Sequence, residues 1–329
     1  TTTAMLSAIL QNSALIGAIS KEFDSNFRYI NDSLSFEADE SDESFILSNP
    51  YCSIVLNTEP EHMEYYKYDT KRFYDAYQKF LDIAKLRVIN AEDTFLKDYQ
   101  KEAIRLYPSK DITNISYFLK DGQPHTKFTL KDMGEFEIWG FGEHIALDAA
   151  MAILAANQSM SVEKIKENLP KYQGIKKRFD VVQNHENFVV IDDYAHHPTE
   201  IKATLAAACQ AKEKKSKVIA VMQPHRFSRL RDLFKDFCTC FNDADVVIVS
   251  DVYPAGEKPL ESASRETLIE GLRAHGHRET WPLNKPEDLA AMIAKIAKSG
   301  DYVVCLGAGS ISSWAQDLPK KLEENGGKL

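Results

Sequence analysis

The sequence predicts an α/β protein of two domains, the second of which is a Rossmann-like, mostly parallel sheet wound on both faces. In the second half of the chain, short apolar runs alternate with stretches of helical periodicity, which is typical of such a sheet. Two of the runs end in dense polar clusters, as strands do where open sheets bind ligands. With 329 residues and 44% hydrophobic content, the chain can bury two cores.

The first predicted domain, residues 1–178, mixes helices and strands. Residues 1–10 are typical of an amphipathic helix that begins without a cap. A second helical stretch, 69–85, places four apolar residues on one side: Phe73, Tyr77, Phe80 and Ile83. Around Asp121-Gly122 the apolar period falls to two, which predicts antiparallel hairpins over 114–139. Further expected elements are strands at 53–57 and 86–90 and helices at about 143–156 and 161–170.

The second predicted domain, residues 179–329, alternates more regularly. The expected strands are 188–193, 217–222, 245–250 and 301–306. The expected helices are about 199–212, 229–242, 264–275 and 286–298. Residues 174–179 lie between the two parts, and we interpret them as a hinge.

Composition disfavours several classes of function. The net charge of −9 disfavours non-specific binding of nucleic acid. No apolar run approaches the length that a bilayer requires, so we expect no membrane partner. The five cysteines lie mostly in apolar settings typical of free thiols, and the Cys238–Cys240 pair has no second pair for zinc. We therefore expect a protein of the reducing cytoplasm.

Two polar clusters follow apolar strands and predict one site for an anionic substrate. Asp192–Glu200 brings acids, a phenol and imidazoles, and Gln223–Arg229 adds an imidazole and two arginines. A third polar segment, Glu37–Glu43, is either a solvated loop or a magnesium site, because hard cations prefer carboxylate oxygens. Asn57–Met63 also follows a strand, although a lone His62 would more often be structural.

Two weaker signals concern phosphate and dinucleotide binding. A threonine run opening a helix, as at Thr1–Thr3, follows the Gly-Lys of a P-loop, although a frayed helix start is the plainer alternative. Gly307–Gly309 resembles half a dinucleotide fingerprint, but it follows the last strand and lacks the third glycine. We interpret it as a structural turn rather than a nicotinamide site of an oxidoreductase.

Taken in order along the chain, these segments resemble the Mur ligase family. Eight segments carry the resemblance: Thr1–Thr3, Glu37–Asp42, Asn57–Met63, Gly142–Asp148, Gly174–Phe179, Asp192–Glu200, Gln223–Arg229 and Asp251–Glu257. The resemblance implies a P-loop-type ATPase domain at 1–178, truncated at its start, and a carboxyl-terminal ligase domain at 179–329. The family's UDP-binding domain and its P-loop glycine and lysine would precede residue 1, so we expect this fragment to be inactive alone.

The resemblance also implies roles for individual residues. Glu37 and His62 would hold two magnesium ions. The residues implied to bind ATP are Thr1, His144, Asp148, Arg178 and Asp193. Those implied to face the muramyl substrate and the incoming amino acid are Tyr194, His196, His225, Arg226 and Arg229. The implied catalytic set is Glu37, His62, Arg178 and His196. Ile145 and Asp148 depart from the family, which has an asparagine pair over adenine, so adenine discrimination should be weakened.

The implied activity is ATP-dependent ligation, with magnesium as cofactor. ATP would phosphorylate the lactoyl carboxylate of UDP-N-acetylmuramate, and L-alanine would displace phosphate from the acyl phosphate, in peptidoglycan precursor synthesis. One alternative is the related ligase that recycles a tripeptide onto the same sugar nucleotide, although Gln223–Arg226 favours L-alanine. A second alternative is a non-catalytic nucleotide-binding fragment.

Overall fold

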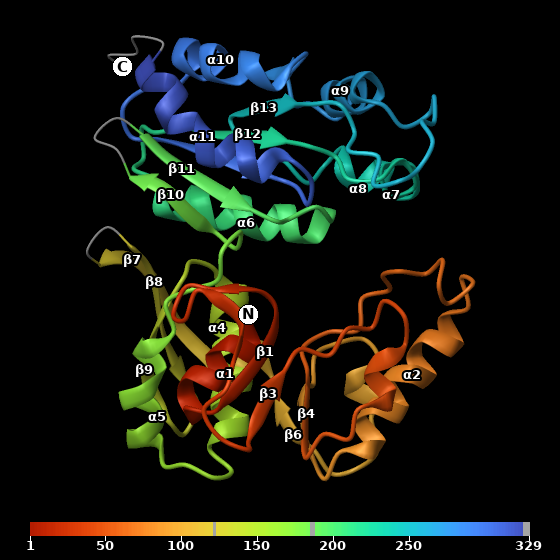
Figure 1. Cartoon of the computed structure of the whole chain (residues 1–329), viewed down its shortest axis with the longest axis vertical. Helices are drawn as coiled ribbons and strands as arrows, with labels where there is room; N and C mark the ends of the chain where they lie inside the picture. The colour runs from red at the N-terminus through yellow and green to blue at the C-terminus, as the bar shows by residue number, and fades with distance from the viewer. Residues whose placement is uncertain (121–122, 185–187, 325–329) are drawn as a thin grey trace. The chain divides into compact units, whose positions relative to one another are not determined.

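The computed structural model describes residues 1–120, 123–184 and 188–324, and these form two compact units (Figure 1). The first unit contains residues 1–116 and 125–175, and the second contains 117–124 and 176–329. The units divide between Ile175 and Lys176, inside the predicted hinge. The domain boundary after residue 178 stays a proposal.

The second unit is built on one sheet of six described strands, in the order β10-β11-β15-β12-β13-β14. Its strands are β10 (Asp180–Asn184), β11 (Phe188–Asp193), β12 (Val218–Met222), β13 (Val246–Val249), β14 (Thr280–Pro282) and β15 (Asp301–Leu306). All neighbours pair in parallel except β10, which is antiparallel to β11. The predicted parallel sheet is confirmed, and its polar strand ends therefore meet at one edge.

Helices cover both faces of this sheet (Figure 1). They are α6 (Pro198–Ala211), α7 (Phe227–Asp232), α8 (Phe234–Phe237), α9 (Arg265–Ala274), α10 (Leu289–Ile296) and α11 (Ile311–Glu324). On one face, α10 and α11 share a core with Val190, Ile219 and Val303. On the other face, α6 packs on β12 and β15. The central strands are buried throughout because both of their faces are covered.

The predicted helix 229–242 is wrong, because the chain breaks it at Leu233 (φ −108°, ψ 21°). Its apolar spacing suits a helix. After α8, the Thr239 hydroxyl and the Cys240 thiol donate to the carbonyls of Asp236 and Phe237, and the helix does not resume. Two edge strands, β10 and β14, and the last helix, α11, were not predicted. The proline inside α11, Pro319, weighs against a helix in the sequence.

Apart from residues 117–120 and 123–124, which belong to the second unit, the first unit holds three further described sheets of three strands each. They are β2-β1-β3 (Ser25–Arg28, Ser13–Ser20, Leu34–Phe36), β4-β5-β6 (Cys52–Val55, Leu86–Asn90, Ile104–Leu106) and β7-β8-β9 (Ile112–Lys120, Gln123–Leu130, Gly134–Trp139). Its helices are α1 (Thr2–Leu10), α2 (Thr70–Ile83), α3 (Pro108–Asp111), α4 (Glu143–Ala156) and α5 (Val162–Asn168). The predicted hairpin strands and the helix at 143–156 are confirmed, whereas Asp121-Gly122 lies outside the described residues.

Two helices of this unit differ from the expected pattern. Helix α1 is not amphipathic, because none of its residues is exposed; it packs on α4, α5 and β1 from different sides. On α2, Ile83 is 37% exposed at the last turn, and Ala76 and Leu81 complete the buried face instead. None of the helices in the described part of the chain combines the length and apolar character that a membrane span requires.

Candidate active site

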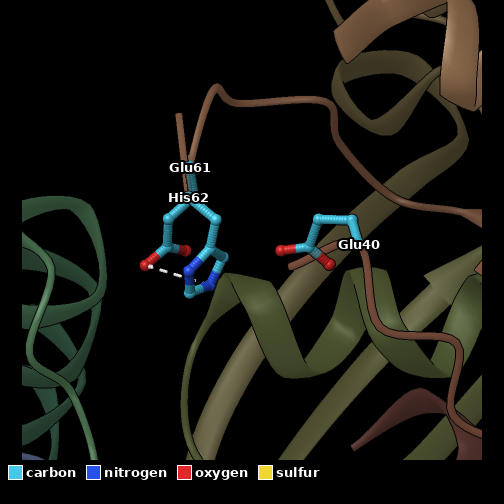
Figure 2. Close-up of side chains that lie close together, drawn as sticks. All are labelled: Glu40, Glu61 and His62. Carbon is cyan, nitrogen blue, oxygen red and sulfur yellow. Dashed lines mark ion pairs between the residues drawn. The ribbon is translucent and has the colours of Figure 1, made fainter. Parts of the chain in front are cut away.

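A possible cation site in the first unit joins Glu40, Glu61 and His62, as Figure 2 shows. One ligating atom of each side chain lies within 4.8 Å of the others, and His62 Nε2 is 4.0 Å from Glu61 Oε1. Burial raises the pKa of Glu40 above its ordinary value. A cation beside this carboxylate would favour its charged form. Two carboxylates and an imidazole fit a divalent cation, and the oxygen ligands suit Mg²⁺.

The backbone holds His62 in this place. Thr58 is fixed at the end of β4 because its amide and hydroxyl both donate to Asp93, at 2.9 and 2.7 Å. His62 itself has a φ of 53°, which is uncommon for a residue other than glycine and costs backbone energy. The loop therefore holds His62 in a strained conformation that places its imidazole near Glu40 and Glu61.

Glu37, the other predicted metal ligand, does not belong to this cluster. Its exposed carboxylate accepts a hydrogen bond from the amide of Gly17 on β1 at 2.9 Å. A side chain at Gly17 would crowd the same carboxylate, since an added Cβ would lie 3.2 Å from Glu37 Oε1. Other acids of the run serve the loop: Asp39 and Asp42 accept from the amides of Ser41 and Ser44.

The predicted nucleotide residues of the first unit lie where α1 meets α4. Thr1 caps α1 through its carbonyl, which accepts from the amide of Met5 at 3.1 Å. The hydroxyl of Thr2 donates to the carboxylate of Asp148. His144 is half-buried in the first turn of α4. Ile145 is a core residue, 5% exposed, and so is positioned for packing rather than for hydrogen bonding.

At the carboxyl end of β11, two adjacent aspartates point to opposite faces of the sheet. Asp193 is buried, and its two oxygens accept from the amides of Phe179 and Ala195, each at 2.7 Å. Burial raises the pKa of Asp193 to about 6, against the opposing effects of Arg178 and the two amides. Asp192 accepts from the hydroxyl of Ser312 at 2.5 Å. Asp193, predicted to meet the ATP ribose, thus already ties the end of β11 to the segment at Phe179.

Arg178, Tyr194 and His196 meet around Glu200, which sequence analysis did not single out. Arg178 lies 3.3 Å from Glu200 Oε1 and places its guanidinium over the Tyr194 ring. The other carboxylate oxygen accepts from the amides of His196 and His197. Burial alone would raise the pKa of Glu200, but Arg178, His196 and these amides outweigh it and lower the pKa. Glu200 therefore stays charged and fixes the turn.

The tautomer of His196 follows from its partner. His196 Nδ1 lies 2.9 Å from the carbonyl oxygen of Tyr194, which can only accept, so Nδ1 carries a proton. In the neutral ring the lone pair is then on Nε2. Asp193 and Glu200 accept hydrogen bonds from the backbone amides on either side of this segment and so fix its conformation. With Nδ1 protonated, Nε2 is the basic nitrogen of the neutral His196 ring.

His225, Arg226 and Arg229 gather at the carboxyl end of β12. The His225 ring lies 5.7 Å from that of His196, and its Nδ1 accepts from Arg229 at 3.3 Å. Burial lowers the pKa of His225 to about 4, with help from His196 and the two arginines. His225 is therefore neutral near pH 7, and the positive charge of this cluster comes from the arginines.

Gly307 and Gly309 serve this edge structurally, as predicted. An added Cβ on Gly309 would lie 2.4 Å from Gln223 Oε1 and 2.7 Å from the Tyr253 ring. Gln223 Oε1 also accepts from the amide of Ile311 at the start of α11. The turn is thus packed against β12 and the loop after β13, which explains its small residues.

Sequence analysis missed Glu40, Glu61, Glu200, Tyr253 and Glu257 as individual residues. All five lie within segments that it did quote, so spacing identified the segments but not their inner contacts. The pairing of Glu40 with His62 depends on loop geometry across β4, which no local pattern encodes.

The chain is similar to known proteins in both sequence and fold. Residues 177–309 match the family model of the Mur ligase glutamate ligase domain. The UDP-N-acetylmuramate–L-alanine ligase of Campylobacter curvus is 53% identical over 264 residues, covering 79% of this chain and 61% of that protein. The chain thus spans about three fifths of the length of this curated relative. The ligase of the same name from Campylobacter jejuni is 45% identical over 317 residues, covering 95% of this chain.

The solved structure of UDP-N-acetylmuramate–alanine ligase from Thermotoga maritima matches with a TM-score of 0.81 at 24% identity. It covers 99% of this chain and 73% of that one, and it supports the fold alone. The family follows from the sequence relatives. Since the chain covers 72% of the C. jejuni protein at 45% identity, it belongs to the Mur ligase family.

Proposed function

We propose that this chain provides the ATP-binding and amino-acid-binding parts of a cytoplasmic ligase that joins L-alanine to UDP-N-acetylmuramate. The observation that carries the proposal is the cluster of Arg226, Arg229, His196 and His225 at the sheet edge. Two arginines supply a fork for a carboxylate, and the amino acid brings one. Identity of 45–53% to alanine ligases supports L-alanine as that amino acid.

The amine step uses the unprotonated nitrogen of His196. The amine of L-alanine must lose a proton before it attacks an activated carbonyl carbon, and His196 Nε2 can take it. A C–N bond then forms, the C–O bond to phosphate breaks, and phosphate leaves with the electron pair. Neutral His225 beside His196 adds no positive charge that would oppose this protonation.

The phosphoryl step depends on charge neutralisation. The carboxylate of UDP-N-acetylmuramate attacks the γ-phosphorus of ATP, and ADP leaves. Arg178 is our candidate for the nucleotide phosphates, since Glu200 and Tyr194 hold its guanidinium. Bound magnesium would supply charge neutralisation at the phosphates, and Glu40, Glu61 and His62 are the residues that would hold it.

The test is release of ADP by the full-length ligase of which this chain would be part, with ATP, magnesium and UDP-N-acetylmuramate, because we expect residues 1–329 alone to be inactive. We expect release to depend on L-alanine. Dependence on the tripeptide instead would assign the recycling ligase. Binding of ATP and L-alanine to the full-length protein without any release would support a non-catalytic binding role and would overturn the ligase proposal.

A further inference from the structure

The loop after β12 holds His225 and Arg226 in an unusual backbone conformation. Arg226 has a φ of 70°, in the left-handed region that residues other than glycine seldom adopt. Its Nε is buried, and among the described residues it has no hydrogen-bond partner. Such a conformation persists only where neighbouring contacts impose it.

The contacts come from the segment Asp251–Glu257, which follows β13. The Tyr253 amide donates to the Pro224 carbonyl at 2.7 Å, and the Arg226 amide donates to the Tyr253 carbonyl at 2.9 Å. These two hydrogen bonds form a bridge between His225 and Tyr253, outside the named strands. The backbone of the substrate loop is therefore fixed on both sides of His225.

The Tyr253 side chain adds a second contact. Its ring stacks on the His225 ring, with centroids 5.5 Å apart and planes at 10°. On its other side, Gly309 leaves the space that the ring occupies, since a Cβ there would lie 2.7 Å from it. The His225 ring is thereby held between Tyr253 and His196.

Glu257 secures the following turn. Its carboxylate accepts from the Ser228 amide at 3.0 Å and from the Ser228 hydroxyl at 2.5 Å. Burial alone would raise its pKa, but the hydrogen bonds from Ser228 and the charge of Arg226 outweigh burial and lower it. A charged Glu257 thus faces the loop immediately after Arg226.

We propose that Asp251–Glu257 is a positioning segment, in which Tyr253 and Glu257 fix His225 and Arg226 in the geometry that receives the amino-acid carboxylate. Tyr253 acts through its neighbours and is a positioning residue. The inference rests on the proposed function for the identity of the ligand, whereas the positioning itself is a property of the chain.

The first test follows His225 by NMR titration in the chain 1–329, with no substrate present. The groups facing His225 are His196 from the loop after β11, Arg226 at the N-cap of α7, Arg229 from α7, and Glu257 and Tyr253 from the loop after β13. Because burial is the largest cause of its low pKa, Tyr253→Ala should raise the His225 pKa from about 4 toward 6.5. Tyr253→Phe keeps the stacked ring and should restore the parent value.

The second test measures KM for L-alanine in the full-length ligase of which this chain would be part. Tyr253→Ala and Gly309→Ala should each raise KM for L-alanine about tenfold or more and leave KM for ATP within about twofold. Trp281→Ala, which removes an exposed aromatic from β14 of the same unit, is the matched control and should change neither constant. Thermal unfolding shows whether each variant folds. If Tyr253→Ala or Gly309→Ala does not fold, the KM values are compared in Tyr253→Phe and Glu257→Gln instead.

Two results separate the hypotheses. An unchanged His225 pKa in folded Tyr253→Ala would overturn the positioning role. A raised pKa in a protein that neither binds nor ligates L-alanine would retain the positioning role and overturn the proposed function.

Discussion

Glu200 and Glu257 hold the loops after β11 and β12 in the same manner. Each carboxylate accepts hydrogen bonds from the amide of its loop, and each lies near an arginine of the candidate site. A carboxylate bound in this way orients the loop and keeps the arginine side chain balanced in charge. In our proposal, the residues that contact substrate are therefore held in place by Glu200 and Glu257, which do not contact substrate themselves.

At the residue scale, Arg229→Lys should weaken amino-acid binding. Lysine keeps the charge but lacks the planar fork, and it cannot repeat the contacts of Arg229 with His225 Nδ1 and the His225 carbonyl. Loss of one charge-assisted hydrogen bond, about 1.5–3 kcal/mol, predicts a rise of roughly 10–100-fold in KM for L-alanine. Steady-state kinetics check this. Arg231→Lys on the same helix is the control, and an equal rise there would contradict the assignment.

The cation site leads to a second prediction at this scale. Glu61→Gln and Glu40→Gln should each weaken binding of a divalent cation, because each removes a charged oxygen ligand near His62. Titration of the chain with Mn²⁺, followed by electron paramagnetic resonance, measures this without any activity. Asp39→Asn removes an exposed acid of the same run and should leave Mn²⁺ binding unchanged. Equal affinity in all three variants would mean that the cluster binds no cation.

At the scale of elements, the sequence predicted what depends on local periodicity. The parallel strands β11, β12, β13 and β15 stand out because they are buried on both faces and read as continuous apolar runs. The short edge strands β10 and β14 could not be predicted in this way, since their pairing depends on a neighbour far along the chain. The break at Leu233 was missed because the apolar spacing of 229–242 suits an unbroken helix.

The candidate site was predicted to a similar extent. Its segments could be found because their polar residues follow strands, and parallel strands bring those ends to one edge. The contacts between segments could not, as Tyr253 shows: its ring meets His225 only because Gly309 approaches from a third segment. The roles of the individual residues stay predictions.

Helix α4 provides a test at this scale, which replaces our expectation that Ile145 affects adenine recognition. Ile145 is buried in the core and packs beside Gly140. Ile145→Asn would bury a side-chain amide in an apolar core and should lower the free energy of unfolding by about 2–4 kcal/mol. Ile145→Val should lower it by only about 1 kcal/mol. Urea unfolding measures both, and a fully stable asparagine variant with tighter ATP binding would favour the nucleotide role.

At the scale of the whole molecule, the buried Asp193 and the half-buried His225 give stability opposite dependences on pH. His225 has a pKa of about 4 in the fold against 6.5 in the unfolded chain, so the unfolded chain binds more protons between these values. Its contribution to the free energy of unfolding therefore increases as pH rises from 4 to 6.5. Asp193, with a pKa of about 6 against 3.8, binds more protons in the fold. Its contribution decreases as pH rises from 3.8 to 6.

Single variants separate the two effects. The stability difference between the parent and His225→Gln should grow in favour of the parent as pH rises from 4 to 6.5. The difference between the parent and Asp193→Asn should shrink as pH rises from 3.8 to 6. Urea unfolding at intervals across this range measures both. A stability difference that does not change across its range would show that the group concerned titrates normally.

The edge strand β14 has a consequence for the protein in concentrated solution. It has three residues and ends at Pro282, which has no N–H to donate to another strand. A foreign strand therefore finds only a short and interrupted template on that side of the six-stranded sheet. The same proline that limits the sheet to its own strands thus protects the folded chain against growth into intermolecular β-assemblies.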